Sequence, residues 1–170
     1  MDPQASPDGF PELLEGRFSG RVEFTGLIRQ ALEAAARQGW PEIILSDPDF
    51  HDWPLGERAV AQALNEWSHA GRKLTILARN YDEVFRRHAR FVAWRRTWGH
   101  IVECRGSASA NAEEIPSALW SPGWVFERLD LQRSAGVAGS EAVRRVALRE
   151  RLNERLRKSS PAFPATTLGL

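Results

Sequence analysis

The sequence predicts an α/β fold with a mainly parallel sheet of about five strands and helices on both faces. Short continuous apolar runs at 42–46 and 73–78 suit strands that are covered on both faces. Amphipathic stretches of about 10–15 residues alternate with these runs, as in repeated strand–helix–strand units. We expect a loose N-terminal arm over 1–16, which is rich in Pro, Asp and Gly, and a single α/β domain over 17–170.

The first part of this domain is expected to form a strand, a helix and a second strand. Residues 17–24 alternate weakly between apolar and polar side chains, which indicates a first strand. Thr25 is a good N-cap for a helix over 26–38. Gly39 stands where a left-handed C-terminal cap is expected, and it leads into the buried strand at 42–46.

The middle of the domain repeats the same pattern. A helix is expected over 57–69, with its apolar residues on one face, and 73–78 is the next buried strand. Asn80, followed three residues later by Glu83, resembles a capping box that starts one or two further helices. Residues 100–105 form the following strand, so three adjacent strands with parallel neighbours are expected.

The last third of the sequence gives weaker signals. Residues 106–123 are rich in Gly, Ser, Asn and Pro and are expected to form a loop, and 124–130 alternates like an edge strand. Ser140 is expected to cap a last helix that runs to about Lys158. The tail over 161–170 is apolar and is expected to be ordered, with Phe163 buried, because disordered tails are usually polar.

Composition limits the class of protein. The chain has 170 residues and a formal net charge of +1, so its global charge favours no particular partner. Only Lys73 and Lys158 of its 23 basic residues are lysines, which reflects either a GC-rich genome or selection for bidentate anion contacts. The single Cys104 excludes an intramolecular disulfide framework. The sequence has no apolar run of membrane-spanning length and no signal peptide at its start, so a cytoplasmic protein without membrane contact is expected.

The carboxyl ends of the predicted strands carry charged residues, and ligands of such sheets bind at those ends. Acidic residues follow the strand at 42–46, whereas arginines lie at the ends of the next two strands. A mixed site of this kind suits a phosphate-bearing or zwitterionic ligand. The candidate ligand-binding residues are Asp47, Asp49, His51, Asp52, Arg79 and Arg105.

A metal-dependent reaction is an alternative use of the same loop. Asp47 and Asp49 could hold Mg²⁺ through oxygen ligands. An aspartate directly after a buried strand, with a second one two residues later, resembles haloacid-dehalogenase-type phosphatases. The small and hydroxyl residues that follow in that family are replaced here by Phe50 and His51. The structural interpretation, in which the two aspartates cap turns around Pro48, stays open. We therefore predict no catalytic residue, no metal ligand and no cofactor.

Residues 80–105 combine six arginines with several aromatic residues. Arginines next to exposed aromatic rings can bind single-stranded nucleic acid. At helical spacing, however, Phe91, Trp94 and Trp98 fall on one face and would belong to the core. The arginines would then form a solvated face. The candidate nucleic-acid residues are Arg86, Arg87, Arg90, Arg95 and Arg96.

The sequence as a whole resembles an uncharacterised family of proteobacterial domains. The resemblance rests on D-P-D-F-H-D-W-P-L-G, on I-L-A-R-N-Y-D-E-V-F-R-R-H-A-R-F-V-A-W-R-R-T-W-G-H and on the tail S-S-P-A-F-P-A-T-T-L-G-L. It covers most of 20–170, and in some relatives the domain follows an acetyltransferase of the GNAT type. The resemblance implies an α/β fold distantly like half of a phospholipase D. The H-x-K-x₄-D catalytic pattern of that superfamily is absent from this sequence, so its activity is not implied.

Three functions remain open from the sequence. The leading one is a non-catalytic cytoplasmic α/β module that binds an anionic small ligand or a protein partner, with a homodimer as one option. The second is a metal-dependent phosphoryl-transfer enzyme or phosphodiester hydrolase that uses Asp47 and Asp49. The third is a nucleic-acid-binding protein that uses the arginines of 86–96.

Overall fold

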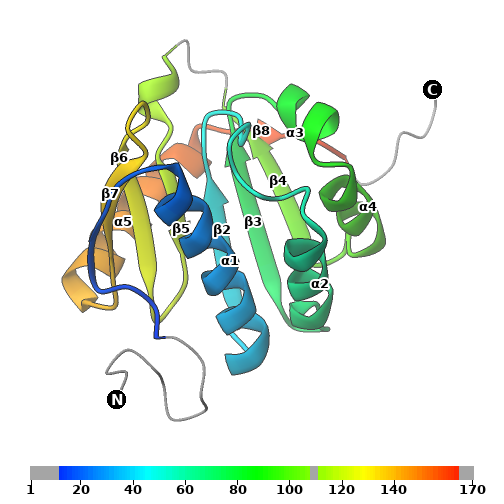
Figure 1. The fold of residues 1–170 in the computed structure, drawn as a ribbon. Coiled ribbons are helices and arrows are strands. Elements are labelled where there is room, and N and C mark those ends of the chain that lie inside the picture. The colour runs from blue at the N-terminus through cyan, green and yellow to red at the C-terminus, as the bar shows by residue number, and fades with distance from the viewer. Residues whose placement is uncertain (1–11, 108–110, 165–170) are drawn as a thin grey trace.

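The chain folds around one eight-stranded sheet (Figure 1). The computed structural model describes residues 12–107 and 111–164. The order of the strands across the sheet is β1-β7-β6-β5-β2-β3-β4-β8. The strands are β1 (Gly16–Phe18), β2 (Glu42–Ser46), β3 (Lys73–Ala78), β4 (Val102–Gly106), β5 (Ser117–Trp120), β6 (Val125–Asp130), β7 (Ala135–Gly139) and β8 (Ser160–Pro161).

The prediction of a mainly parallel sheet of about five strands is wrong. Among the described residues only the β2–β3 and β3–β4 pairs are parallel. The β1–β7, β7–β6, β6–β5, β5–β2 and β4–β8 pairs are antiparallel. The sheet is therefore mixed: a parallel centre carries an antiparallel meander on one side and a short antiparallel strand on the other.

The parallel centre itself follows the prediction. The expected strands at 42–46 and 73–78 are β2 and β3, and the strand expected at 100–105 is β4, shifted by about one residue. Leu74 and Ile76 face one side of β3 in the main core, whereas Thr75 faces the other side. These three strands are neighbours and parallel, as their apolar runs indicated.

Helices cover both faces of the sheet (Figure 1). Four helices lie on one face and build the main core with the sheet, whereas α5 lies alone on the other face. The second core is small and contains Leu148 and Leu152 of α5 with Ile44 and Val125. The helices are α1 (Arg21–Gln38), α2 (Arg58–Trp67), α3 (Asp82–Arg87), α4 (Ala89–Thr97) and α5 (Ala142–Arg157), with a short 3₁₀ helix at Ala112–Glu114.

Two predicted boundaries near the start of the chain are wrong. The expected strand over 17–24 ends at Phe18, and α1 already begins at Arg21. Thr25 is not an N-cap but lies inside α1, where its hydroxyl donates to the carbonyl of Arg21 at 3.0 Å. The predicted left-handed cap at Gly39 is confirmed, with φ 70° and ψ 46°.

Later in the chain, the expected edge strand over 124–130 is β6, which lies inside the sheet between β5 and β7. The predicted burial of Phe163 is confirmed. Leu168 and Leu170 lie outside the described residues. No helix in the described ranges is long and apolar enough to span a bilayer.

Candidate functional site

A buried ion cluster lies between the sheet and α1, centred on Arg128 of β6. Its guanidinium donates to both carboxylate oxygens of Asp52, at 2.6 and 3.2 Å, and to Asp47 at 3.0 Å. Ser117 and Ser134 accept the remaining hydrogen bonds, at 3.0 and 3.2 Å. The side chain of Arg128 is only 1% exposed, so these bonds replace water completely.

The loop after β2 is shaped by Asp47. Its Oδ2 accepts the backbone N–H of Asp49 at 3.2 Å and that of Phe50 at 2.8 Å. Phe50 has a φ of 61°, a left-handed conformation that non-glycine residues rarely adopt. The ring Nε2 of buried His88 donates to the carbonyl of Phe50 at 2.7 Å and fixes the loop against the α3–α4 junction.

The two carboxylates of the cluster differ in their electrostatics. Burial raises the pKa of Asp47 above its ordinary value, although Arg128 acts against this. Burial also acts on Asp52, but the hydrogen bonds and charge of Arg128 outweigh it and lower its pKa. Two causes separate the two carboxylates: Asp47 is more deeply buried, and Arg128 contacts both oxygens of Asp52 but one oxygen of Asp47. A cluster with two carboxylates and one guanidinium carries one excess negative charge when all three groups are ionised.

The structure does not bring all six predicted ligand-binding residues together. Asp47 and Asp52 belong to the buried cluster, with side chains 2% and 3% exposed. Asp49 and His51 are more exposed and contact each other through Oδ1 and Nδ1 at 2.8 Å. Arg79 is exposed at the end of β3.

Arg105 points to a different part of the molecule. It donates to Ser159, just after α5, through Nε at 2.9 Å to the hydroxyl and Nη2 at 2.6 Å to the carbonyl.

Both carboxylate oxygens of Asp47 already accept hydrogen bonds, one from Arg128 and the other from two backbone N–H groups. The described ranges contain no group of three His, Cys, Asp or Glu side chains that could hold a metal ion. Ligand binding by the six residues stays a prediction.

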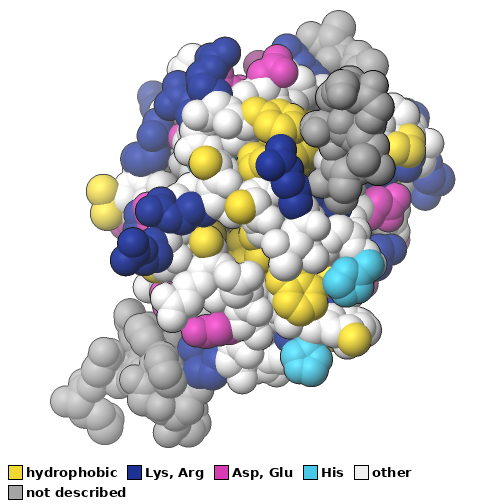
Figure 2. Space-filling model, turned by 90° about the vertical axis from the view of Figure 1, so that its right-hand side faces the viewer, with side chains coloured by type: hydrophobic (Ala, Val, Ile, Leu, Met, Phe, Trp, Pro, Cys, Tyr) yellow, Lys and Arg dark blue, Asp and Glu magenta, His cyan; other side chains and the backbone are white. Residues whose placement is uncertain are grey.

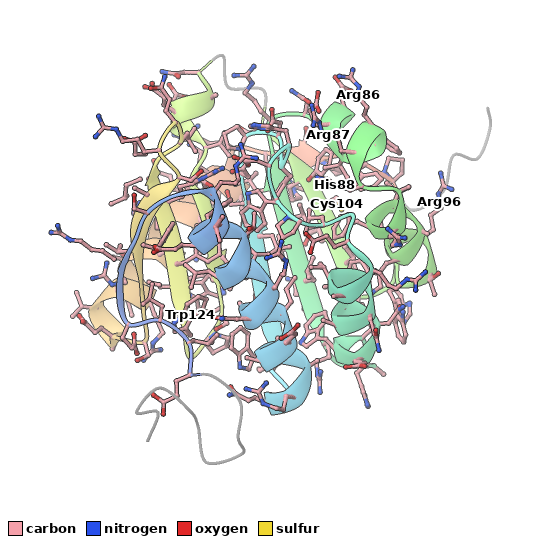
Figure 3. The ribbon with its side chains drawn as sticks, viewed as in Figure 1. Arg86, Arg87, His88, Arg96, Cys104 and Trp124 are labelled. Atoms are coloured by element: carbon pink, nitrogen blue, oxygen red, sulfur yellow. The ribbon has the colours of Figure 1, made fainter. Side chains whose placement is uncertain are left out.

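The five candidate nucleic-acid arginines have different surroundings. Arg86 and Arg87 pair with Glu83 on the outside of α3, and Arg90 donates to the carbonyl of Gly56 at 2.8 Å. Arg86 and Arg87 are the last two residues of α3, and Figure 3 shows them near the top of the molecule, with Arg96 projecting outward from α4. In Figure 2 the basic side chains on this side of the molecule stand in separate groups, with apolar, histidine and uncharged surface between them.

Arg95 is not a surface residue. It is 6% exposed, and its Nε and Nη2 donate to the carbonyl of Phe163 at 3.3 and 3.2 Å. The Phe163 ring packs against Tyr81 and Phe85, with ring centroids 5.1 and 4.7 Å apart. Arg95 therefore holds the segment after β8 in place. Whether the remaining arginines bind nucleic acid stays a prediction.

The α5 side of the molecule carries a surface that sequence patterns did not identify. Val143 and Val146 of α5 are 81% and 56% exposed. The sequence pattern placed Val146 on the apolar stripe of the last helix, with Ala142, Leu148, Leu152 and Leu156. Leu129 and Leu131, at the end of β6, are also exposed and line a cavity with Arg151 of α5. We call Leu129, Leu131, Val143 and Val146 the α5 surface. Helix α5 buries only Leu148 and Leu152 in the second core, so most of its circumference faces solvent.

No protein-family model matches the sequence. The curated proteins similar to it include the urease accessory proteins UreF of Bordetella parapertussis and Bordetella bronchiseptica, each 27% identical over 129 residues. A bifunctional urease accessory protein UreEF of Bordetella bronchiseptica matches at the same identity. The alignments cover 68% of this chain, 57% of each UreF and 29% of UreEF, so the chain spans about half the length of the UreF proteins it matches. These relatives are named for an accessory role and not for a catalysed reaction.

One solved structure shares the fold. The chain superimposes on TrmBL2, an archaeal chromatin protein whose structure shows a novel mode of DNA binding, with a TM-score of 0.61 and 19% identity. That match covers 86% of this chain and 53% of TrmBL2. Polyphosphate kinase from Porphyromonas gingivalis gives a TM-score of 0.49 at 15% identity, over 88% of this chain and 25% of the kinase. The first match indicates a shared fold, and a shared fold alone does not imply a shared function.

Proposed function

We propose that this chain is a non-catalytic module that binds a protein partner, in the way that an accessory protein does. The observation that carries the proposal is the α5 surface, which holds four of the six exposed large hydrophobic side chains in the described ranges. They form two pairs, Val143 with Val146 one turn apart on α5, and Leu129 with Leu131 beside Arg151 of the same helix. Exposed apolar side chains on one side of a molecule are typical of protein–protein contact sites. The similarity to urease accessory proteins favours a protein partner over a small ligand or a nucleic acid.

The chemistry of the α5 surface fits such a partner. Around its apolar side chains stand paired charges, including Arg151 with Glu127 and Arg155 with Glu114. An apolar centre with a charged, already paired rim is the usual anatomy of a protein–protein interface. The buried cluster of Arg128 supports the non-catalytic part of the proposal, because the carboxylates of a metal-dependent enzyme would have to face a substrate.

The kind of partner is proposed from the similarity to known proteins. The matched relatives are urease accessory proteins, so we expect the chain to bind urease subunits or other urease accessory proteins of the cell that makes it. The test is affinity co-purification of the tagged chain with these proteins, quantified by mass spectrometry. Val143→Asp together with Val146→Asp should abolish the co-purification, because the change places two carboxylates where two exposed apolar side chains of the α5 surface would contact the partner.

A matched control uses the opposite side of the molecule. Val22 of α1 is 84% exposed and lies on the face covered by four helices, so Val22→Asp should leave co-purification unchanged. Equal loss in both variants would contradict the α5 surface as the contact. A dimer in light scattering that the double substitution abolishes would assign this surface to a second copy of the chain and would overturn the proposal.

A further inference from the structure

A separate cavity lies on the α5 face of the sheet, away from the Arg128 cluster. It is an open cavity with a volume of about 420 Å³, bounded by β2, β3 and β4 on one side and bordered by the second half of α5 on the other. Volumes of this size are typical of small-molecule sites, which span roughly 300–1,000 Å³. Its charged lining consists of Glu42, Lys73, Glu103, Arg105, Arg149 and Arg157.

The polarity of this cavity is unusual for its place in the fold. Parallel strands are normally apolar on both faces because helices cover both. On β3, Leu74 and Ile76 obey this rule on the side of the main core, but Lys73 and Thr75 face the cavity. Helix α5 runs behind the sheet from the β7 side toward β8 (Figure 1), so an apolar helix does not cover this part of the parallel centre.

The cationic side chains stand at two levels along the strands. At one end, Lys73 is in register with Glu42, whose carboxylate pairs with Arg149 at 3.3 Å. At the other end, Arg105 is in register with Leu77 of β3. From Lys73 to Leu77 a strand rises by about 13 Å, at roughly 3.3 Å per residue. Thr75 lies between the two levels and is in register with Glu103 of β4, whose carboxylate is 3.6 Å from the Arg105 guanidinium.

Two of the four cations are held rigidly and two are not paired. Arg105 is fixed by its two hydrogen bonds to Ser159, and Arg149 lies 4.4 Å from the centre of the Trp120 ring. Within 12–107 and 111–164, Lys73 and Arg157 form no ion pair. Fixed guanidinium groups bind anions at a low entropic cost, and unpaired ammonium or guanidinium groups bind anions without first breaking an ion pair.

We propose that this cavity binds a small molecule that carries an anionic phosphate group at each of its two ends. One phosphate contacts Lys73 and Arg149, and the other contacts Arg105 and Arg157. The lining carries four positive and two negative side chains, so the site keeps a positive excess for a polyanion. A single phosphate reaches one level only and binds more weakly.

Calorimetric titration with fructose 1,6-bisphosphate, fructose 6-phosphate and inorganic phosphate tests this proposal on the intact chain. The bisphosphate should bind at least about tenfold more tightly than either monophosphate, since a second charge-assisted contact contributes about 1.5–3 kcal/mol. No heat from the bisphosphate at millimolar concentration, or equal affinity for all three anions, would overturn the two-ended site.

Variants of the unpaired cations locate the site without disturbing the fold. Lys73→Met and Arg157→Ala should each weaken bisphosphate binding by about tenfold or more. Arg96→Ala removes one exposed positive charge on α4, outside the cavity, and should change the affinity by less than about twofold. Equal weakening by all three substitutions would show that only the net charge matters, and the cavity would then not be the site.

Discussion

Replacing Arg128 should destabilise the fold more than any surface substitution. Arg128→Met keeps the volume of the side chain but leaves Asp47 and Asp52 buried without their counter-ion. Breaking a buried ion pair by removing one partner costs about 3–5 kcal/mol. The cation also lies 4.0 Å from the centre of the Phe24 ring, a contact that Met only partly replaces. The total stability of a domain is about 5–15 kcal/mol, so this single change removes a large share of it.

The assay is urea denaturation followed by tryptophan fluorescence. With a slope of about 2 kcal/mol per molar urea, a loss of this size lowers the midpoint by roughly 2 M. The variant should regain part of this stability at acidic pH, because protonation removes the unpaired charges of Asp47 and Asp52.

A triple variant separates charge from packing. Arg128→Met, Asp47→Asn and Asp52→Asn together remove every charge of the cluster and keep its shape. This protein should be more stable than the Arg128→Met variant, because replacing a whole ion cluster is often nearly neutral. A loss below about 1 kcal/mol for Arg128→Met, or no recovery in the triple variant, would refute the claim that the cluster is held by charge pairing.

Three further predictions concern stability. Burial lowers the pKa of His88 in the folded protein below its ordinary value of 6.5. Neutral His88 therefore stabilises the fold above pH 6.5, and this stabilisation is lost as the pH falls from 6.5 through the pKa of the folded protein. Urea midpoints at neutral and acidic pH should therefore differ more for the wild type than for His88→Gln, and equal differences would contradict this. Phe163→Ala should cost about 3 kcal/mol in the same assay, and a cost below about 1 kcal/mol would show that the ring is not part of the core. Gly136→Ala should cost at least about 3 kcal/mol, since a Cβ there would lie 2.0 Å from the carbonyl oxygen of Glu127. Gly123→Ala, whose Cβ would meet open space, is its control and should be nearly neutral.

The sequence predicted the parallel centre of the fold but not its antiparallel additions. The run at 73–78 is apolar except for Lys73 and Thr75, so its strand could be predicted to the residue. Strand β7 reads A-G-V-A-G, a composition with low strand propensity. Its Gly136 is required by the close approach of β6, which depends on tertiary structure and leaves no local signal. The partners of short strands such as β5 and β8 are likewise set by packing across the chain.

The candidate site was also predicted only in part, because its partners are set by packing between distant parts of the chain. The sequence correctly marked the aspartates after β2 as unusual, but it gave no indication that Arg128 would be their partner, because the two segments are far apart in the chain. The alternation of side chains along β6 does indicate that Arg128 points inward, because it follows buried Phe126 by two residues, but it does not identify the partner of Arg128. The exposure of Val146 could not be predicted, because an apolar stripe on a helix predicts burial of its members.

Photo-crosslinking from the α5 surface tests the central claim most directly. A benzophenone amino acid is placed at position 146 and, in a second protein, at position 22 of α1, where the natural valine is more exposed still. Each protein is irradiated with purified urease subunits and urease accessory proteins. We expect a crosslink to one of these proteins from position 146 and none from position 22. A crosslink from position 22 alone, or from neither position, would contradict the assignment of α5 as the partner-binding surface.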